Sequence, residues 1–273
     1  SEYTGYTVVT VHAKKIDLTE NALVNRYDAV DGYAALDITV DGEILEITLT
    51  GTNATYKTDD GLSINVTDVK SGYYNLSVYT DVCEYKGQLV LADFVIKTAA
   101  QLDNWPSYIR PEGWGLDKAS SYNKFVVLGA DIDYGGANYM NELGNYGSFT
   151  VNGRYPKVIE AGKKVADGKA DNANAVKAGY DARFYGIFDG LGHTISNIGF
   201  AQQRSGLFGE YMHGTVKNLS VVGVDIRRTN FVGAISGRFY GVAENVFVEG
   251  KISKNVNAYS GLFSGNLEGS AKL

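Results

Sequence analysis

The chain has 273 residues and a net charge of −6, with acidic and basic side chains interspersed. It therefore lacks the basic stripe that nucleic acid binding needs, and no run of eighteen apolar residues could span a membrane. The single cysteine, Cys83, excludes an internal disulfide framework and every multi-cysteine metal site. The 33 Gly and 20 Tyr beside only 3 Pro predict many short strands separated by tight turns.

Residues 1–97 contain strand-like runs at the spacing of a β-sandwich, namely 6–11, 33–40, 44–50, 62–67, 73–79 and 88–96. The alternation Leu-Glu-Ile-Thr-Leu at 45–49 predicts one buried and one solvated face. Asp41-Gly42 lies between two runs and predicts a two-residue hairpin turn. We expect an Ig-like β-sandwich without the disulfide, which acts as a spacer.

The pattern changes near Lys97. Thr98 predicts the N-cap of a short helix over residues 98–102, and the stretch 105–115 is irregular. A strand at 125–128 follows, closed by Asp131-Ile132-Asp133. Residues 136–182 are polar and rich in Ala, Lys, Gly and Asn, which predicts a long inserted loop.

A repeat is the strongest signal in the sequence. Gly-Leu-Phe-Gly at 206–209 recurs as Gly-Ala-Ile-Ser-Gly at 233–237 and as Gly-Leu-Phe-Ser-Gly at 261–265. Asn-Leu-Ser-Val-Val-Gly at 218–223 likewise recurs as Asn-Val-Phe-Val-Glu-Gly at 245–250. The period of 27 and then 28 residues suits one coil of a parallel β-helix, in which each strand pairs with its counterpart one repeat later. We therefore expect this fold over residues 98–273.

In such a coil the apolar residues of successive repeats lie above one another. The predicted interior column sets Leu207, Phe208, Leu219, Val221 and Ile226 over Ala234, Ile235, Val246, Val248 and Ile252. Glycine is expected where the path needs positive φ, and the Asn at 197, 218 and 245 also tolerate left-handed geometry. Stacked in register, these amides can hydrogen-bond along the axis. The structural repeat residues are thus Gly206, Gly209, Asn218, Gly233, Gly237, Asn245, Gly261 and Gly265.

The segment 184–198, with Asp189-Gly190 and Asn197-Ile198, resembles the opening segment of proteins that carry the GLUG motif. Gly-Leu-Phe-Gly at 206–209 resembles the repeat core for which that family is named, and the second copy departs from it at Ala234-Ile235. The resemblance covers about residues 96–273 apart from 136–182. It implies a right-handed β-helix in a large exported bacterial protein, such as an adhesin or the amino-terminal region of an IgA-specific metallopeptidase. It supplies no active site.

The sequence carries no recognised catalytic motif. There is no His-Glu-x-x-His, and Cys83 lies in a strand-like run without a neighbouring His, which favours a buried structural thiol. The pairs Asp131/Asp133 and Asp189/His193 could each act as an acid/base set of a polysaccharide hydrolase or lyase. Turn hydrogen bonds explain these acids more simply. Asp131 and Asp133 could also bind calcium, because oxygen-rich turns suit that ion.

Tyrosines gather in or beside the inserted loop. Their rings can stack on sugars or anchor a protein interface, so residues 134–182 form the expected ligand-facing region. The alternative is that the rings hold the loop against the flank of the β-helix. The tyrosines are Tyr134, Tyr139, Tyr146, Tyr155 and Tyr180.

The sequence thus predicts a non-enzymatic, secreted or cell-surface scaffold or adhesin that binds glycan or protein, with no cofactor except possible calcium. Its expected partners include further domains of the same polypeptide, because the chain starts at Ser1 without Met and its repeats stop mid-coil. The alternatives are a carbohydrate-active β-helix enzyme and the accessory region of a larger surface metallopeptidase.

Overall fold

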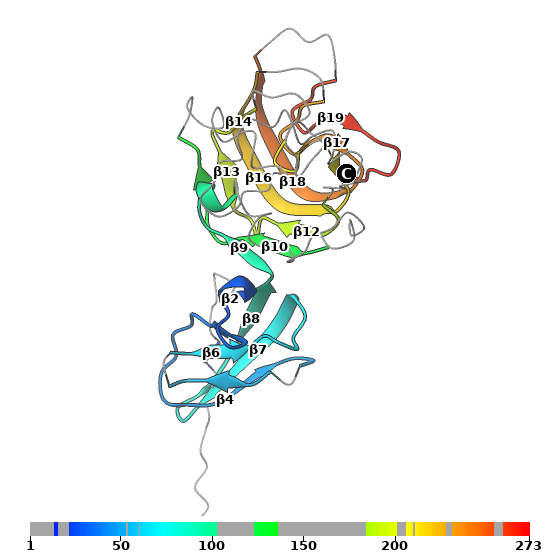
Figure 1. The fold of residues 1–273 in the computed structure, drawn as a ribbon. Coiled ribbons are helices and arrows are strands. Elements are labelled where there is room, and N and C mark those ends of the chain that lie inside the picture. Colours follow the sequence, from blue (N-terminus) through cyan, green and yellow to red (C-terminus); the bar gives the residue numbers. More distant parts are fainter. Residues whose placement is uncertain are drawn as a thin grey trace, which may run out of the picture. The chain divides into compact units, whose positions relative to one another are not determined.

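The computed structural model describes residues 14–15, 22–52, 54–59, 61–102, 123–135, 184–200, 206–209, 211–227, 231–253 and 259–273. The chain divides into two compact units, Ser1–Ala92 and Asp93–Leu273. The fold is nearly all β, as the composition predicts (Figure 1). The predicted strand at 6–11, the irregular stretch 105–115 and the inserted loop 136–182 lie outside the described residues.

The first unit contains two sheets. The larger has the order β1-β8-β7-β4 with β2 also paired to β8, and the smaller has the order β3-β6-β5. The bounds are β1 Lys14–Lys15, β2 Ala22–Asn25, η1 Arg26–Asp28, β3 Tyr33–Ala35, β4 Ile44–Leu49, β5 Tyr56–Lys57, β6 Ser63–Asn65, β7 Gly72–Thr80 and β8 Glu84–Ala92. Strands β4, β7 and β8 pair antiparallel, whereas β1 and β2 pair parallel to β8.

Both sheets of this unit contribute to one apolar core. Leu76, Val78 and Leu89 come from the larger sheet and Ala34 and Ile64 from the smaller. Cys83 is buried beside them, which confirms the prediction of a buried thiol.

Two local predictions for this unit are wrong. Asp41-Gly42 is a bend with a φ of +88° at Gly42, but it joins no hairpin, because β3 pairs with β6 and β4 pairs with β7. The alternation at 45–49 fails at Leu45, which is exposed. The β4–β7 register shifts between Ile44 and Glu46, and such a bulge turns one residue away from its expected face.

The second unit is a parallel β-helix of about three turns. Every strand pairing described within it is parallel, as the repeat predicts. Its strands are β9 Phe94–Ile96, β10 Phe125–Leu128, β11 Ile132–Asp133, β12 Ile187–Asp189, β13 Thr194–Ser196, β14 Gly199–Phe200, β15 Tyr211–Met212, β16 Thr215–Ile226, β17 Ser236–Phe239, β18 Val242–Ile252 and β19 Ser264–Leu267. The single strand predicted at 88–96 is therefore two strands: its first part belongs to β8 of the first unit, and its last part is β9, which pairs with β10 of the β-helix.

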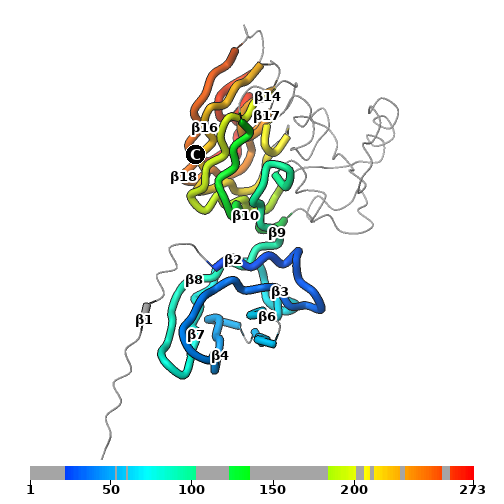
Figure 2. Tube along the Cα trace, turned by 90° about the vertical axis from the view of Figure 1, so that its left-hand side faces the viewer, coloured from blue at the N-terminus to red at the C-terminus, as the bar shows by residue number. Residues whose placement is uncertain are grey.

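Two stacks of strands build the coils. One stack runs through β9, β10, β12, β16 and β18, with β11, β13 and β14 alongside, and the other is β15-β17-β19. Figure 2 shows the long strands β16 and β18 running side by side. The register of Thr215 with Val242 and of Ser236 with Ser264 confirms the periods of 27 and 28 residues.

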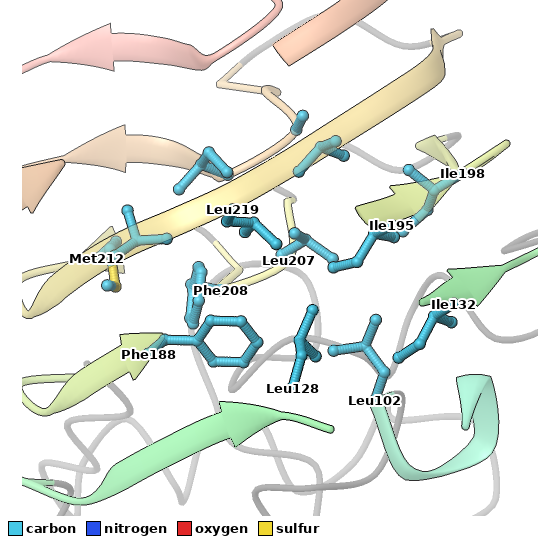
Figure 3. Close-up of a cluster of buried hydrophobic side chains, with 14 of the residues drawn as sticks. Leu102, Leu128, Ile132, Phe188, Ile195, Ile198, Leu207, Phe208, Met212 and Leu219 are labelled. Atoms are coloured by element: carbon cyan, nitrogen blue, oxygen red, sulfur yellow. The ribbon is translucent and has the colours of Figure 1, made fainter. Parts of the chain in front are cut away.

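The predicted interior column is confirmed in its register. Leu219 pairs with Val246, Val221 with Val248 and Ile226 with Ile252, while Leu207 and Phe208 donate backbone hydrogen bonds to Ala234 and Ile235. Figure 3 shows the buried side chains directed into one space, among them Leu128, Phe188, Phe208 and Leu219. Each contributes roughly 1.5–3 kcal/mol by burial. Val246 and Val248 are half-buried, and Ile252 is exposed.

The predicted short helix begins as expected. Residues 99–102 have helical geometry, and the Oγ1 of Thr98 accepts a hydrogen bond from the backbone N–H of Gln101 (3.2 Å). The side chain of Gln101 in turn accepts from the N–H of Lys97 (2.8 Å), a reciprocal arrangement close to a capping box. It sets Leu102 into the core of the β-helix (Figure 3).

Candidate functional site

The repeat glycines permit close approach between coils. A Cβ atom at Gly206 would lie 2.6 Å from the carbonyl oxygen of Gly233 and from the backbone nitrogen of Ser236, and one at Gly233 would lie 2.6 Å from the carbonyl oxygen of Phe263. A Cβ atom at Gly261 or Gly265 would also overlap backbone atoms. Backbone of another repeat occupies the side-chain space at Gly206, Gly233 and Gly265, and the carbonyl oxygen of Ser264 in the same turn occupies it at Gly261, so these positions need glycine.

Positive φ explains fewer of these glycines than the sequence analysis expects. Of Gly206, Gly209, Gly233, Gly237, Gly261 and Gly265, only Gly209 has a left-handed backbone, with a φ of 73°. The carbonyl oxygen of Gly209 accepts a hydrogen bond from the N–H of Gly237 (2.9 Å). The conformational reason is therefore wrong for the other five, and steric overlap replaces it for the four described above.

A ladder of polar side chains runs along the axis. The Nδ2 of Asn245 donates to the Oδ1 of Asn218 (3.1 Å), and the Nδ2 of Asn218 donates to the Oδ1 of Asp189 (3.1 Å). Both asparagines are left-handed, with φ of 52° and 49°. We call Asp189, Asn218 and Asn245 the Asp–Asn ladder. It confirms the expected axial hydrogen bonds at Asn218 and Asn245.

Asn197 stands in a different column. It is left-handed as expected (φ 55°), but the register of Ser196 with Val222 sets it beside Gly223 and not beside Asn218. Its Nδ2 donates to the Oδ1 of Asp133 (2.8 Å). The expected stacking of Asn197 with Asn218 is therefore wrong, because a coil has left-handed positions at both Asn218 and Gly223.

The carboxylates of Asp131 and Asp133 flank buried Ile132 and are both exposed. The N–H of Thr194 donates to the Oδ1 of Asp131 (2.8 Å), and this bond, followed by that with His193, holds the pKa of Asp131 below its ordinary value. Hydrogen bonds from Asn197 and then from the Gly135 N–H lower the pKa of Asp133 in the same way. Both acids are thus held as carboxylates, which accept hydrogen bonds and are poor proton donors.

The two acid/base pairs predicted from the sequence, Asp131/Asp133 and Asp189/His193, do not lie together as pairs in the structure. The Nδ1 of His193 lies 3.1 Å from the Oδ1 of Asp131, so His193 contacts an acid of the other pair. Asp189 is buried and accepts from the N–H of Leu191 (2.8 Å) as well as from Asn218, with the Nζ of Lys217 at 3.5 Å from its Oδ2. The expected turn hydrogen bonds are therefore present at Asp133 and Asp189, whereas Asp131 accepts its hydrogen bonds from residues of another coil.

A calcium site stays a prediction. Across the described parts of the chain, no three or more His, Cys, Asp and Glu side chains converge in a way that could hold a metal ion. Within the same parts, no helix is long and apolar enough to cross a membrane.

Of the predicted ligand-facing tyrosines, Tyr134 falls within the described residues. It is half-buried against the core of the β-helix, and its N–H donates to the carbonyl oxygen of Ser196 (3.0 Å). This contact agrees with the alternative, in which the ring packs on the flank of the β-helix, and a ligand-facing role of Tyr134 stays a prediction. Tyr139, Tyr146, Tyr155 and Tyr180 lie outside the described residues.

Three rings on successive coils form a stack that was not predicted from the sequence. The ring of His213 lies between Tyr185 and Tyr240, with centroid distances of 5.0 and 4.4 Å. Each ring precedes a glycine, namely Gly186, Gly214 and Gly241, and a Cβ atom at Gly214 or Gly241 would overlap the backbone of the preceding glycine. An aromatic residue before the repeated glycine is the signal that could have identified the stack.

A buried carboxylate was missed as well. Asp225 is 6% exposed and accepts hydrogen bonds from the Nε of Arg227 (2.8 Å) and the hydroxyl of Ser253, with the Nζ of Lys251 at 3.9 Å. Burial acts to raise the pKa of Asp225, but the bonds from Ser253 and Arg227 outweigh it, so the pKa lies below its ordinary value. The group joins β16 to β18 and so belongs to the coil architecture.

Comparison with known proteins gives one short similarity. A stretch of 79 residues, 28% of the chain, is 35% identical to part of Halomucin from Haloquadratum walsbyi (strain DSM 16790 / HBSQ001). The chain spans about 1% of the length of that relative. No family model and no solved structure matches the chain.

Proposed function

We propose that the chain is a non-enzymatic part of a secreted or cell-surface protein, where it acts as a scaffold or adhesin that binds glycan or protein. One observation supports this more than any other: each acid nominated for catalysis is held by hydrogen bonds that stabilise the fold. The partners are Thr194 and His193 for Asp131, Asn197 for Asp133, and Asn218 for Asp189. A general acid needs a raised pKa, whereas Asp131 and Asp133 have lowered ones.

The similarity to Halomucin supports a surface location. For the finer architecture, we propose that the first unit is an Ig-like sandwich and that the β-helix is right-handed with GLUG-type repeats. The two sheets that share a core support the first proposal. The recurring glycine pairs at 206–209, 233–237 and 261–265 support the second.

A panel of neutral and acidic polysaccharides and of surface proteins tests this function. The purified chain should bind at least one member and should leave glycosidic bonds intact, as measured by the reducing ends released. Release of reducing ends that is abolished by Asp131→Asn or Asp189→Asn, in variants that keep their circular dichroism spectrum, would instead establish a carbohydrate-active enzyme. Asp37→Asn, an exposed substitution in the first unit, is the matched control.

A further inference from the structure

The larger sheet of the first unit has one face in the core, and its other face is open to solvent from Glu84 to Gln88 of β8, whereas Val90, which pairs with Tyr73, is buried. Along β7, Leu76 and Val78 are buried, whereas Tyr73, Asn75 and Tyr79 are exposed and Ser77 is half-buried. The register places Gln88 beside Asn75, Lys86 and Thr48 beside Ser77, and Glu84 and Glu46 beside Tyr79. We call these outward residues of β4, β7 and β8 the Tyr73–Tyr79 face.

Two tyrosine rings lie at opposite ends of this face. Tyr73 is 47% and Tyr79 38% exposed; Tyr79 lies between β8 and β4, whereas Tyr73 lies beyond the end of β4 and pairs with β8. They are six residues apart on one strand, which separates them by about 20 Å at the usual rise of ~3.4 Å per residue. Tyr85 of the same sheet instead points into the core.

The ring of Tyr79 lies across the sheet. Its hydroxyl hydrogen-bonds to the carboxylate of Glu84, which sits opposite it on β8. The side chain therefore extends toward the neighbouring strand, and 38% of it is exposed to solvent. The partially negative face of an aromatic ring attracts the C–H groups of a flat, saturated ring such as a sugar.

Polar groups fill the space between the two rings. Asn75 and Gln88 supply amides, and Ser77 and Thr48 supply hydroxyls, so each row offers donors and acceptors. Glu84 is paired with Lys86 (3.0 Å), which leaves Glu46 as the net charge of the face. Such a surface suits a neutral, hydroxyl-rich ligand and lacks the cluster of cations that a polyanion needs.

We propose that the Tyr73–Tyr79 face binds a linear neutral polysaccharide that runs along β7. Tyr73 and Tyr79 stack against two of its sugar rings, and the amides and hydroxyls between them bind the intervening sugars. The proposal rests on the glycan-binding function above and assigns it to the unit expected from the sequence to be a spacer. A protein partner fits less well, because the face measures on the order of 300 Å², whereas a stable protein interface uses about 800 Å² per partner.

The full chain and unbranched neutral oligosaccharides of increasing length, drawn from β-glucan, mannan, xylan and chitin, provide the test by titration calorimetry. Affinity should rise with length until the ligand spans ~20 Å and then level off. Tyr73→Ala and Tyr79→Ala should each weaken binding about tenfold, the loss typical of a truncated aromatic anchor. Tyr259→Ala is the matched control, because Tyr259 is 59% exposed but belongs to the second unit and not to this face.

The outcomes separate this inference from the function on which it rests. Binding that survives both substitutions, or that falls equally in Tyr259→Ala, overturns the inference and leaves glycan binding elsewhere on the chain. Binding to acidic polysaccharides or proteins alone also overturns it and leaves the adhesin function. The failure of every glycan and protein probe overturns both. Both tyrosines point away from the core, so Tyr73→Ala and Tyr79→Ala should keep the thermal transition of the wild type. An unchanged transition verifies that each variant is folded.

Discussion

The two units use the side chains of their strands in different ways. In the β-helix each strand pairs with its equivalent in the next coil, so residues of one type stack into columns such as the Asp–Asn ladder. In the first unit the antiparallel strands β4, β7 and β8 alternate between a core face and a free face. A polar residue of the β-helix that stands in a column is therefore structural, whereas Tyr73, Asn75 and Tyr79 of β7 point away from the core of the first unit.

The comparison also explains where glycine is required. Steric overlap with neighbouring backbone recurs through the β-helix, at Gly186, Gly190, Gly206, Gly214, Gly233 and Gly241 among others. In the first unit, Gly51, Gly61 and Gly72 have open space at the Cβ position, and a Cβ atom at Gly32 or Gly42 would meet side-chain atoms instead of backbone. Close coil contacts make the β-helix the more sensitive unit to small substitutions.

The largest effect is expected from a side chain placed between two coils. Gly214→Val sets a Cβ atom into the backbone of Gly186, so the coils must separate. We expect a loss of more than about 4 kcal/mol, which is enough to unfold the β-helix. Hydrogen exchange of the unit 93–273, measured by mass spectrometry, reports the change.

Gly269→Val is the matched control, because Gly269 holds the corresponding place in the repeat but has open space at its Cβ position. It should change the stability by less than about 0.5 kcal/mol. Equal protection from hydrogen exchange in Gly214→Val and Gly269→Val would refute the proposal that steric overlap between coils requires glycine at position 214.

A large cavity gives the next effect. Phe208 is buried, with its ring 5.1 Å from Phe188 and 5.6 Å from Phe184. Phe208→Ala should cost about 3–5 kcal/mol because it removes a full aromatic side chain from the core. Chemical denaturation checks the value, and Phe247→Ala, at an exposed site of β18, serves as the control. A loss that is no larger than in this control would contradict the assigned core.

Periodicity made the β-helix readable from sequence. The spacing of 206–209 and 233–237 predicts the coil length, and an apolar pair such as Leu219 and Val246 predicts which residues stack. The prediction that Asn197 stacks on Asn218 was wrong because one coil contains two left-handed positions, Asn218 and Gly223. The short sequence around Asn197 does not reveal which of the two it matches. The role of Asp225 carries no such signal, because its partner Ser253 lies 28 residues further along the chain, on another coil.

The first unit was less predictable because its pairings are not repeated. Strand alternation identifies β7 and β8, but it does not reveal that β4 pairs with β7 and that β3 pairs with β6. The alternation of apolar and polar residues also does not reveal the bulge beside Leu45. The candidate ligand face depended on that register, which brings Lys86 and Thr48 to either side of Ser77.

A buried charge in the β-helix gives an intermediate effect with a pH dependence. Asp225→Asn should cost about 1.5–3 kcal/mol at neutral pH, because it weakens the charge-assisted bonds from Arg227 and Ser253. The folded pKa of Asp225 is lowered, so its contribution is present above the unfolded pKa of about 3.9 and is lost as the pH falls through the folded value.

The difference between wild type and Asp225→Asn should therefore shrink in acid, below about pH 4. Urea denaturation at a series of pH values measures it. Glu249→Gln, at an exposed position of β18, controls for the loss of one charge. If the difference in stability between wild type and Asp225→Asn grew in acid, the Asp225 carboxylate would not stabilise the fold through its charge.

The Asp–Asn ladder sets a smaller effect. Asn218→Ala removes the amide between Asp189 and Asn245 and puts alanine at a φ of 49°, which costs about 1–2 kcal/mol in backbone conformation alone. Asn218→Gly separates the two causes, since glycine accepts this φ but makes no ladder bond. Thermal denaturation should rank Asn218→Gly between wild type and Asn218→Ala, and equal transitions would exclude a backbone cost.

The smallest effect belongs to the free face of the first unit. Asn75→Ala and Ser77→Ala remove side chains that point away from the core on β7, so each should change the free energy of unfolding by less than about 0.5 kcal/mol. The adjacent Val78→Ala, which faces the core, should cost several times more. Chemical denaturation of the three variants measures the contrast on one strand. A large loss at Asn75 or Ser77 would mean that the fold needs these polar groups, and the division between a packed face and a ligand face would fail.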